Sequence, residues 1–210
     1  MKKLTEIIIE KIDADIFSHS ALAACVTGSA ARQYSLLKRA MACGEVIGIR
    51  RGLYCLAEKY RRRPFDLFEV AQRVYGPSYI SFESALSFQG WIPEAVRSVT
   101  SVSIGKAKEF RSPVGVFSFR RVPTNIFFEG VERLPSGVLV ARPFKALLDY
   151  IYVYKNDWTG VRPVVESLRV DDNLLRKVSR AEIRRYRSNY PQKRIQKFLM
   201  SFEKEMECEH

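Results

Sequence analysis

Apolar residues recur every three or four positions in the first third of the chain and predict an amphipathic helix over Ser29–Ala42. The repeating positions are Ala30, Tyr34, Leu37 and Met41, a spacing that places them on one side of a helix. The polar positions expected on the opposite side are Arg32, Ser35 and Arg39, with Lys38 at the edge. Ser29 can cap the first turn through its hydroxyl, and Gly44 can end the helix in a left-handed conformation.

Two short runs of β-prone residues follow this helix. Val46–Ile49 and Leu53–Leu56 are predicted strands, and Arg50-Arg51-Gly52 between them forms a tight turn with two cations. A helix with a basic outer side can enter the major groove of DNA, and a basic hairpin beside it can hold phosphate or the minor groove. The order of these elements therefore favours a nucleic-acid-binding unit over a helix and hairpin with solvated charges.

Two further helices are predicted before this unit. The first covers Leu4–Phe17, and the second covers Ala21–Val26, where either Ser18 or Ser20 can provide the cap. Three helices followed by a hairpin are typical of a winged helix-turn-helix, which we assign to residues 1–60.

The rest of the chain mixes helical and strand patterns, and we assign it to a second domain over residues 64–210. Strands are predicted at Tyr79–Ser81, Val96–Ile104, Val114–Val122 and Gly137–Ala141. Helices are predicted at Phe65–Tyr75, Phe82–Gln89, Phe144–Tyr154, Val161–Leu168, Asp172–Val178, Arg180–Ser188 and Gln192–Glu207. We expect an α+β fold: an N-terminal winged helix-turn-helix followed by a mixed α/β domain with a helical C-terminal region.

The charge of the chain agrees with a polyanionic partner. It has 35 Lys and Arg against 23 Asp and Glu, a net charge of +12, which favours nucleic acid as a partner but says nothing about fold. Basic residues concentrate in two zones, Ser29–Arg63 and Arg176–Arg194. The predicted DNA-binding residues of the first zone are Ser29, Arg32, Ser35, Lys38, Arg39, Arg50 and Arg51. A candidate second basic surface, for DNA or RNA, consists of Arg180, Arg184, Arg185 and Arg187.

The segment Glu58–Arg63, EKYRRR, joins the two predicted domains and ends at Pro64. Two interpretations of it stay open: a solvated linker, or a strap that contacts phosphate. Because each side has its own apolar periodicity, we expect few contacts to cross this segment, and we expect the two domains to be separable.

Three phrases of the sequence resemble AbiEi-type antitoxins, the antitoxin half of type IV toxin–antitoxin (abortive infection) systems. They are RRGLYCLA at Arg50–Ala57, YISFESALSFQGWIPEAV at Tyr79–Val96 and ARPFKALLDYIY at Ala141–Tyr152. The resemblance covers nearly the whole chain, in the same order. Its more specific parts are Ser84–Leu86 and Lys145–Asp149.

The resemblance implies a role for each domain. The winged helix would repress its own operon by binding repeated sites in promoter DNA. The second domain would counteract a cognate nucleotidyltransferase toxin encoded next door, without a stable complex between them. Ser84, Lys145 and Asp149 lie in the resembling phrases, and they mark either an antitoxin surface or structural polar groups at helix ends.

An enzymatic alternative depends on carboxylates, because the only histidines are His19 and His210. No Ser/His/Asp set and no glycine-rich phosphate loop can be assembled. A metal-dependent nucleic-acid-processing enzyme, targeted by the winged helix, would use Glu83, Asp149, Asp171 and Asp172, with Lys145. Helix caps, helix dipoles and ion pairs account for these residues more simply. We therefore expect no catalysis, no cofactor and no metal.

The remaining composition indicates a cytoplasmic protein. The four cysteines lack metal-ligand spacing and are expected as free thiols: Cys25, Cys43, Cys55 and Cys208. No apolar run approaches the roughly 20 residues that cross a bilayer, so no membrane partner is expected. Five aromatic residues could stack on RNA bases, although core positions are favoured for them: Phe82, Phe88, Trp91, Phe127 and Phe128.

Overall fold

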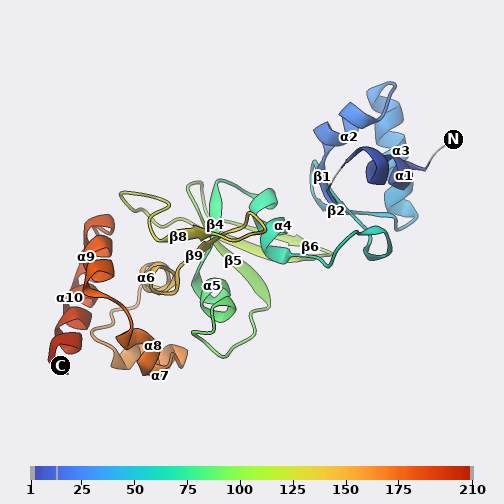
Figure 1. The fold of residues 1–210 in the computed structure, drawn as a ribbon. Helices are drawn as coiled ribbons and strands as arrows, with labels where there is room; N and C mark the ends of the chain where they lie inside the picture. The colour runs from blue at the N-terminus through green and yellow to red at the C-terminus, as the bar shows by residue number, and fades with distance from the viewer. Residues whose placement is uncertain (1–2, 13, 209–210) are drawn as a thin grey trace.

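The computed structural model describes residues 3–12 and 14–208, with Glu207 and Cys208 described by their backbone alone. Within this part the chain forms ten α-helices, one short 3-10 helix and two β-sheets, which confirms the α+β class. The first sheet and the first three helices lie at one end of an elongated molecule, and the last helices lie at the other end (Figure 1). His210, and Asp13 within the first predicted helix, lie outside the described residues.

The N-terminal part combines three helices with a three-stranded sheet of order β1-β3-β2. Its helices are α1 (Leu4–Lys11), α2 (His19–Cys25) and α3 (Ala30–Ala42). Its strands are β1 (Ile16–Ser18), β2 (Val46–Arg50) and β3 (Leu53–Leu56). The Ser18 hydroxyl caps α2, Ser29 caps α3, and Gly44 follows α3 with a left-handed φ of +65°. The predicted caps, the end of α3 and both predicted strands are thus confirmed.

The first helix is shorter than predicted, because a strand replaces its second half. α1 ends at Lys11, and Ile16–Ser18 pairs antiparallel with β3. The prediction of one helix over Leu4–Phe17 is therefore wrong beyond Lys11. Successive residues of a strand point to opposite faces of a sheet, and both Ile16 and Phe17 are buried, because both faces of this sheet are covered.

Different cores cover the two faces of the small sheet. The residues that face the three helices and join the core of the N-terminal part are Phe17, Val46 and Leu56. The residues that face away and join the core of the second sheet are Ile16, Ile49, Leu53 and Cys55. Strand β2 also lies beside strand β6 (Lys108–Ser112) of the second sheet. Contacts thus cross between the two parts of the protein, which differs from the expectation of few such contacts.

The joining segment Glu58–Arg63 is held against the protein. It begins with the 3-10 helix η1 (Glu58–Tyr60), and the guanidinium of Arg61 lies 3.9 Å from the centre of the Phe65 ring. The Arg62 backbone N–H donates to the Asp15 carboxylate at 3.1 Å, and the Arg62 guanidinium donates to the Ile12 carbonyl at 3.2 Å. Arg63 pairs with Glu69. The segment thus contacts both parts of the protein, while Arg62 and Arg63 stay exposed to solvent.

The second sheet has six strands in the order β6-β7-β5-β4-β9-β8. Besides β6, its strands are β4 (Ser78–Ile80), β5 (Ser98–Ser103), β7 (Gly115–Arg120), β8 (Val131–Arg133) and β9 (Leu139–Ala141). The four inner strands were predicted, whereas β6 and β8 were not. These two are the edge strands, and edge strands tolerate charged residues that obscure a strand pattern.

Seven helices accompany this sheet, and all seven were predicted to within a few residues. They are α4 (Leu67–Val74), α5 (Phe82–Phe88), α6 (Pro143–Val153), α7 (Arg162–Leu168), α8 (Asp172–Arg176), α9 (Arg180–Asn189) and α10 (Lys193–Cys208). Helix α4 packs on β4, β5 and β7, while α6 packs on both α5 and α10. Helix α6 therefore lies at the centre of the second part of the protein, and most of its side chains are buried.

The fold bears on two further features of the sequence, the absence of a long apolar run and the four cysteines. In the described part of the chain, no helix has the length and apolar character that a bilayer crossing requires. Cys25, Cys43 and Cys55 are free thiols, while the side chain of Cys208 lies outside the described part.

Candidate nucleic-acid interface

Helix α3 is packed on a different side from the one that its apolar residues predict. Leu37 and Ala40 are its buried residues, and Gln33 and Leu36 are half-buried beside them. Three residues of the predicted apolar side are instead exposed: Ala30, Tyr34 and Met41. The predicted stripe is therefore wrong except at Leu37.

The polar side chain of Gln33 explains part of this rotation. Its amide nitrogen donates hydrogen bonds to the backbone carbonyls of Ala23 at 3.3 Å and Val26 at 2.9 Å. These bonds satisfy carbonyl groups at the end of α2 that have no partner within that helix. Gln33 thus fixes the turn between α2 and α3, and it was missed from the sequence because a lone glutamine carries no pattern.

The exposed part of α3 has three sides. At 3.6 residues per turn, the side directly opposite the buried residues carries mostly short side chains: Ala31, Ser35, Lys38 and Ala42, all exposed. Tyr34 and Met41 lie on the flank that faces the β2–β3 hairpin. Arg32 and Arg39 lie on the other flank, toward α1.

A groove separates α3 from the β2–β3 hairpin. Its lining is Tyr34, Leu37, Lys38, Met41, Gly48, Ile49, Arg50, Arg51 and Tyr54. The floor is apolar, and three cationic side chains, from Lys38, Arg50 and Arg51, surround it. An Arg50 guanidinium nitrogen donates to the Arg51 backbone carbonyl at 3.0 Å, so the turn of the hairpin is held by one of its own cations. The structure thus brings together Lys38, Arg50 and Arg51 of the predicted DNA-binding residues.

The other predicted DNA-binding residues lie elsewhere on α3. Ser29 caps the helix, since its hydroxyl accepts a hydrogen bond from the Arg32 N–H at 3.3 Å. Arg32 lines a cavity with α1 and the end of α2, and Arg39 lines a second cavity with Glu45 and the start of α1. Arg32 and Arg39 are therefore separated from the hairpin by the width of the helix.

The second basic zone lies at the far end of the molecule from α3 (Figure 1). Much of its charge is neutralised within the protein, in the ion pairs Arg185–Glu129 at 3.3 Å and Arg187–Glu203 at 3.0 Å. Arg180 and Arg184 are exposed on α9. Helix α10 continues this zone beyond Arg194 with an exposed row: Lys193, Lys197, Met200 and Lys204. The two basic zones therefore form two separate surfaces.

Ser84, Lys145 and Asp149 do not form a surface. Ser84 is 4% exposed, and the side chains of Lys145 and Asp149 are fully buried. The Ser84 hydroxyl accepts a hydrogen bond from the Thr100 N–H at 2.8 Å and donates to the Ser98 carbonyl at 3.2 Å. The interpretation as an antitoxin surface is thus contradicted, and these residues serve as structural polar groups.

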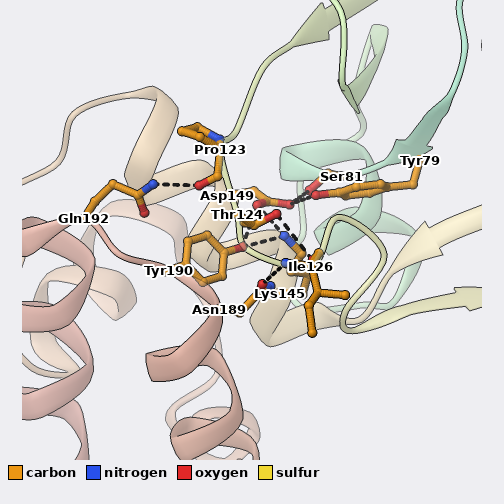
Figure 2. A network of polar contacts seen from close by, with 10 residues as sticks. All are labelled: Tyr79, Ser81, Pro123, Thr124, Ile126, Lys145, Asp149, Asn189, Tyr190 and Gln192. Atoms are coloured by element: carbon orange, nitrogen blue, oxygen red, sulfur yellow. Dashed lines mark hydrogen bonds and ion pairs between the residues drawn. The ribbon is translucent and has the colours of Figure 1, made fainter.

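Lys145 and Asp149 are the centre of a buried hydrogen-bonded network (Figure 2). One carboxylate oxygen of Asp149 accepts from the Lys145 ammonium at 2.8 Å and from the Tyr190 hydroxyl at 2.6 Å. The other oxygen accepts from Tyr79 at 3.1 Å and Ser81 at 2.8 Å. Burial and the nearby Asp149 charge hold the pKa of Tyr79 and of Tyr190 well above the ordinary tyrosine value. The network ties β4, α6 and the end of α9 together.

A loop segment lies over this network and is fastened to the α9–α10 junction (Figure 2). The Pro123 carbonyl accepts from the Gln192 amide at 2.6 Å, and the Ile126 N–H donates to the Asn189 amide oxygen at 2.6 Å. These bonds hold the loop over the network and cover the region around Lys145. The network is therefore part of the buried core of the protein.

The carboxylates of the enzymatic alternative are dispersed. Glu83 accepts a hydrogen bond from the Tyr154 hydroxyl at 2.7 Å, Asp171 caps α8, and Asp172 pairs with Arg176. Asp149 is committed to Lys145. Among the described residues, no three His, Cys, Asp or Glu side chains gather as a metal site would require. The structure therefore does not bring these candidate residues together.

The aromatic residues considered for base stacking are mostly packed. Phe82 is buried, and Trp91 and Phe127 pack against the core. Phe88 and Phe128 are exposed, but each packs edge-on against another ring. The ring centres are 5.4 Å apart for Phe88 and Phe68 and 4.7 Å apart for Phe128 and Phe127. The core interpretation is thus confirmed for Phe82, Trp91 and Phe127.

Comparison with known proteins adds no further assignment. No protein-family model matches the chain, and no curated protein matches it at a significant level. Functional conclusions therefore rest on the residues and geometry described above.

Cys55 and the buried tyrosines make the stability of the protein sensitive to alkaline pH. Burial raises the pKa of the Cys55 thiol from 9.0 to about 11. As pH rises, the thiol ionises in the unfolded chain before it ionises in the folded protein, and this favours unfolding. The contribution of the neutral Cys55 thiol to stability is therefore fully present below pH 9 and is lost between pH 9 and about 11. We expect the free energy of unfolding, measured with urea, to fall over this range. In a Cys55→Ala variant the fall should begin only above pH 10, where the tyrosines ionise in the unfolded chain while Tyr79 and Tyr190 stay protonated in the folded one. An unchanged onset would contradict this assignment.

Proposed function

We propose that the N-terminal part is a winged helix-turn-helix that binds DNA, with α3 as the recognition helix and the β2–β3 hairpin as the wing. The observation that carries this proposal is the groove between these two elements, where Lys38, Arg50 and Arg51 lie around one opening. A helix that exposes short side chains can approach the base edges of a major groove closely, and cations at its border can bind the phosphates of the strand. The proposed ligand is therefore duplex DNA.

We further propose that the protein is a cytoplasmic autorepressor and antitoxin of the AbiEi type. This part rests on the resemblance of Arg50–Ala57, Tyr79–Val96 and Ala141–Tyr152 to that family. The proposed partners are promoter DNA with repeated sites and a cognate nucleotidyltransferase toxin, counteracted without a stable complex. Because Ser84, Lys145 and Asp149 are buried, the proposed antitoxin activity depends on other residues at the surface.

Co-expression tests the antitoxin proposal. Cells that express the neighbouring reading frame from an inducible promoter should stop growing, and this chain should restore colony formation. Restoration should persist in the Arg50→Ala/Arg51→Ala variant, because both substitutions lie in the N-terminal part, whereas the resemblance assigns the antitoxin activity to the second domain. A neighbouring gene without toxicity, or toxicity that the chain leaves unchanged, would contradict the proposal.

Salt dependence tests the DNA-binding proposal. Binding to the promoter should weaken as salt rises, with a log–log slope of about −0.9 for each phosphate contact. The double variant Arg50→Ala/Arg51→Ala should reduce the magnitude of this slope by about 1.8, if each arginine contacts one phosphate. It should weaken binding to all sequences about equally, because phosphate contacts carry no sequence information.

A matched control removes the same charge at the other end of the molecule. The double variant Lys193→Ala/Lys197→Ala changes two exposed cations of α10 and should leave the slope unchanged. Equal effects of the two double variants in a gel-shift titration would show that binding follows net charge rather than the groove. A wild-type protein with no preference for its promoter over random duplex would contradict the proposed function.

A further inference from the structure

We propose that Tyr34 and Met41 are specificity-determining residues, which contact thymine methyl groups in the major groove. The inference rests on the proposed DNA-binding function and assigns base recognition to the hairpin side of α3. From the sequence alone, Arg32 and Arg39 were predicted among the DNA-binding residues, and Tyr34 and Met41 were predicted to be buried.

The exposure of Tyr34 and Met41 is the first observation. Tyr34 is 63% exposed and Met41 is 42% exposed, although both occur at the spacing of a buried helical stripe. Leu37, at the same spacing, is only 2% exposed. Packing within this chain therefore leaves much of both large apolar side chains uncovered, and both lie along a groove that an external ligand can enter.

The chemistry of the groove selects the ligand. Its apolar part is formed by Tyr34, Met41 and Tyr54, and its cations are Lys38, Arg50 and Arg51. A ligand that complements this surface presents negative charge beside apolar groups. Duplex DNA does so in its major groove, where the C5-methyl of thymine projects between two phosphate backbones. Apolar side chains are the groups that distinguish this methyl from the other base edges.

The outer side of α3 determines which side chains can reach the bases. Ala31, Ser35 and Ala42 are short, so the helix can approach the base edges until the longer neighbouring side chains touch them. On the hairpin side these neighbours are Tyr34 and Lys38, which lie on the same side as the cations of the wing. Arg32 and Arg39 lie on the opposite flank, toward α1 and away from the cations of the wing.

Gly48 keeps the floor of this groove open. A Cβ atom at this position would lie 3.1 Å from the terminal methyl of Met41, closer than ordinary van der Waals contact. Because glycine has no side chain, the terminal methyl of Met41 can lie close to the backbone of β2 at this position.

The test removes single methyl groups from the DNA. Footprinting with the full-length protein defines the protected site in the DNA upstream of its own reading frame. Each thymine of that site is then replaced in turn by deoxyuridine, and affinities are measured for the wild type, Tyr34→Ala, Met41→Ala and Tyr34→Phe. We expect at least one replacement to weaken wild-type binding about fourfold, the effect of one methyl group removed from an apolar contact.

The variants assign that methyl to a side chain. The fourfold effect should disappear in Tyr34→Ala or in Met41→Ala and persist in Tyr34→Phe, which keeps the ring. Because both positions are exposed, the melting temperatures should match that of the wild type. If specific binding is retained but no deoxyuridine replacement matters, or if the effect persists in both Tyr34→Ala and Met41→Ala, the inference is overturned while the proposed function stands. If the wild type protects no site, the proposed function itself fails.

Discussion

Replacing Asp149 by alanine is expected to lower the free energy of unfolding by about 3–5 kcal/mol, the cost of removing one partner from a buried ion pair. The Lys145 ammonium would remain in the core without its carboxylate, which now lies 2.8 Å away. The hydroxyls of Tyr79, Ser81 and Tyr190 would lose their common acceptor as well. Urea unfolding at neutral pH measures this loss.

The chain contains a matched control for this substitution. Arg162 and Glu166 form an ion pair with the same i,i+4 spacing, but their side chains are 87% and 60% exposed. Exposed helical pairs contribute about 0.3–0.5 kcal/mol, so Glu166→Ala should change stability by about that amount. If Asp149→Ala and Glu166→Ala had similar small effects, the buried network would not have the structural role described here.

Removing residues 1–63 is the second change with a large expected effect. The shortened chain should unfold at a clearly lower temperature than the intact protein, because the surface around β6 would lose the side chains that now cover it. The apolar residues removed from this interface are Ile16, Ile49, Leu53 and Cys55, all buried in the core of the second part. Each large apolar side chain contributes about 1.5–3 kcal/mol when it is fully buried, so the loss should amount to several kcal/mol.

Calorimetry on the intact chain gives the complementary result. A shared core should make the two parts unfold in one transition, whereas independent domains would give two. A shortened chain with the melting temperature of the intact protein would show that the interface contributes little, and that the separability expected from the sequence is correct. If the interface is strong, DNA binding and antitoxin activity can be separated by Arg50→Ala/Arg51→Ala but not by truncation.

Local signals in the sequence were sufficient for most secondary structure. Ser29 and Gly44 mark the ends of α3 because a cap and a left-handed residue depend only on the adjacent backbone. Leu53–Leu56 was recognisable as a strand because it is continuously apolar. The same run also indicated that the strand is covered on both faces, which was overlooked. A strand with one face exposed alternates between apolar and polar residues, and this one does not. In the structure one face of this strand joins the core of the N-terminal part and the other joins the core of the second part.

The candidate site depended on information that local sequence does not carry. Tyr34 and Met41 fit a helical period, yet the side of α3 that became buried was the one where Gln33 could reach the carbonyls of Ala23 and Val26. Period alone specifies a face of a helix but not the neighbour that covers it. The row of residues toward the hairpin was consequently left exposed, and the groove with Arg50 and Arg51 appeared only once the chain had folded.

The sequence by itself determined the α+β class, the order of the helices and the inner strands, the caps of α2 and α3, and the excess of positive charge. These properties follow from interactions between residues close together in the chain and from composition. Only the tertiary structure decided that Lys145 and Asp149 are buried and that the small sheet joins two cores. The physical reason is that burial depends on side chains brought from distant positions, such as Tyr79 and Tyr190 around Asp149, and the free energy of a charge is set by those neighbours.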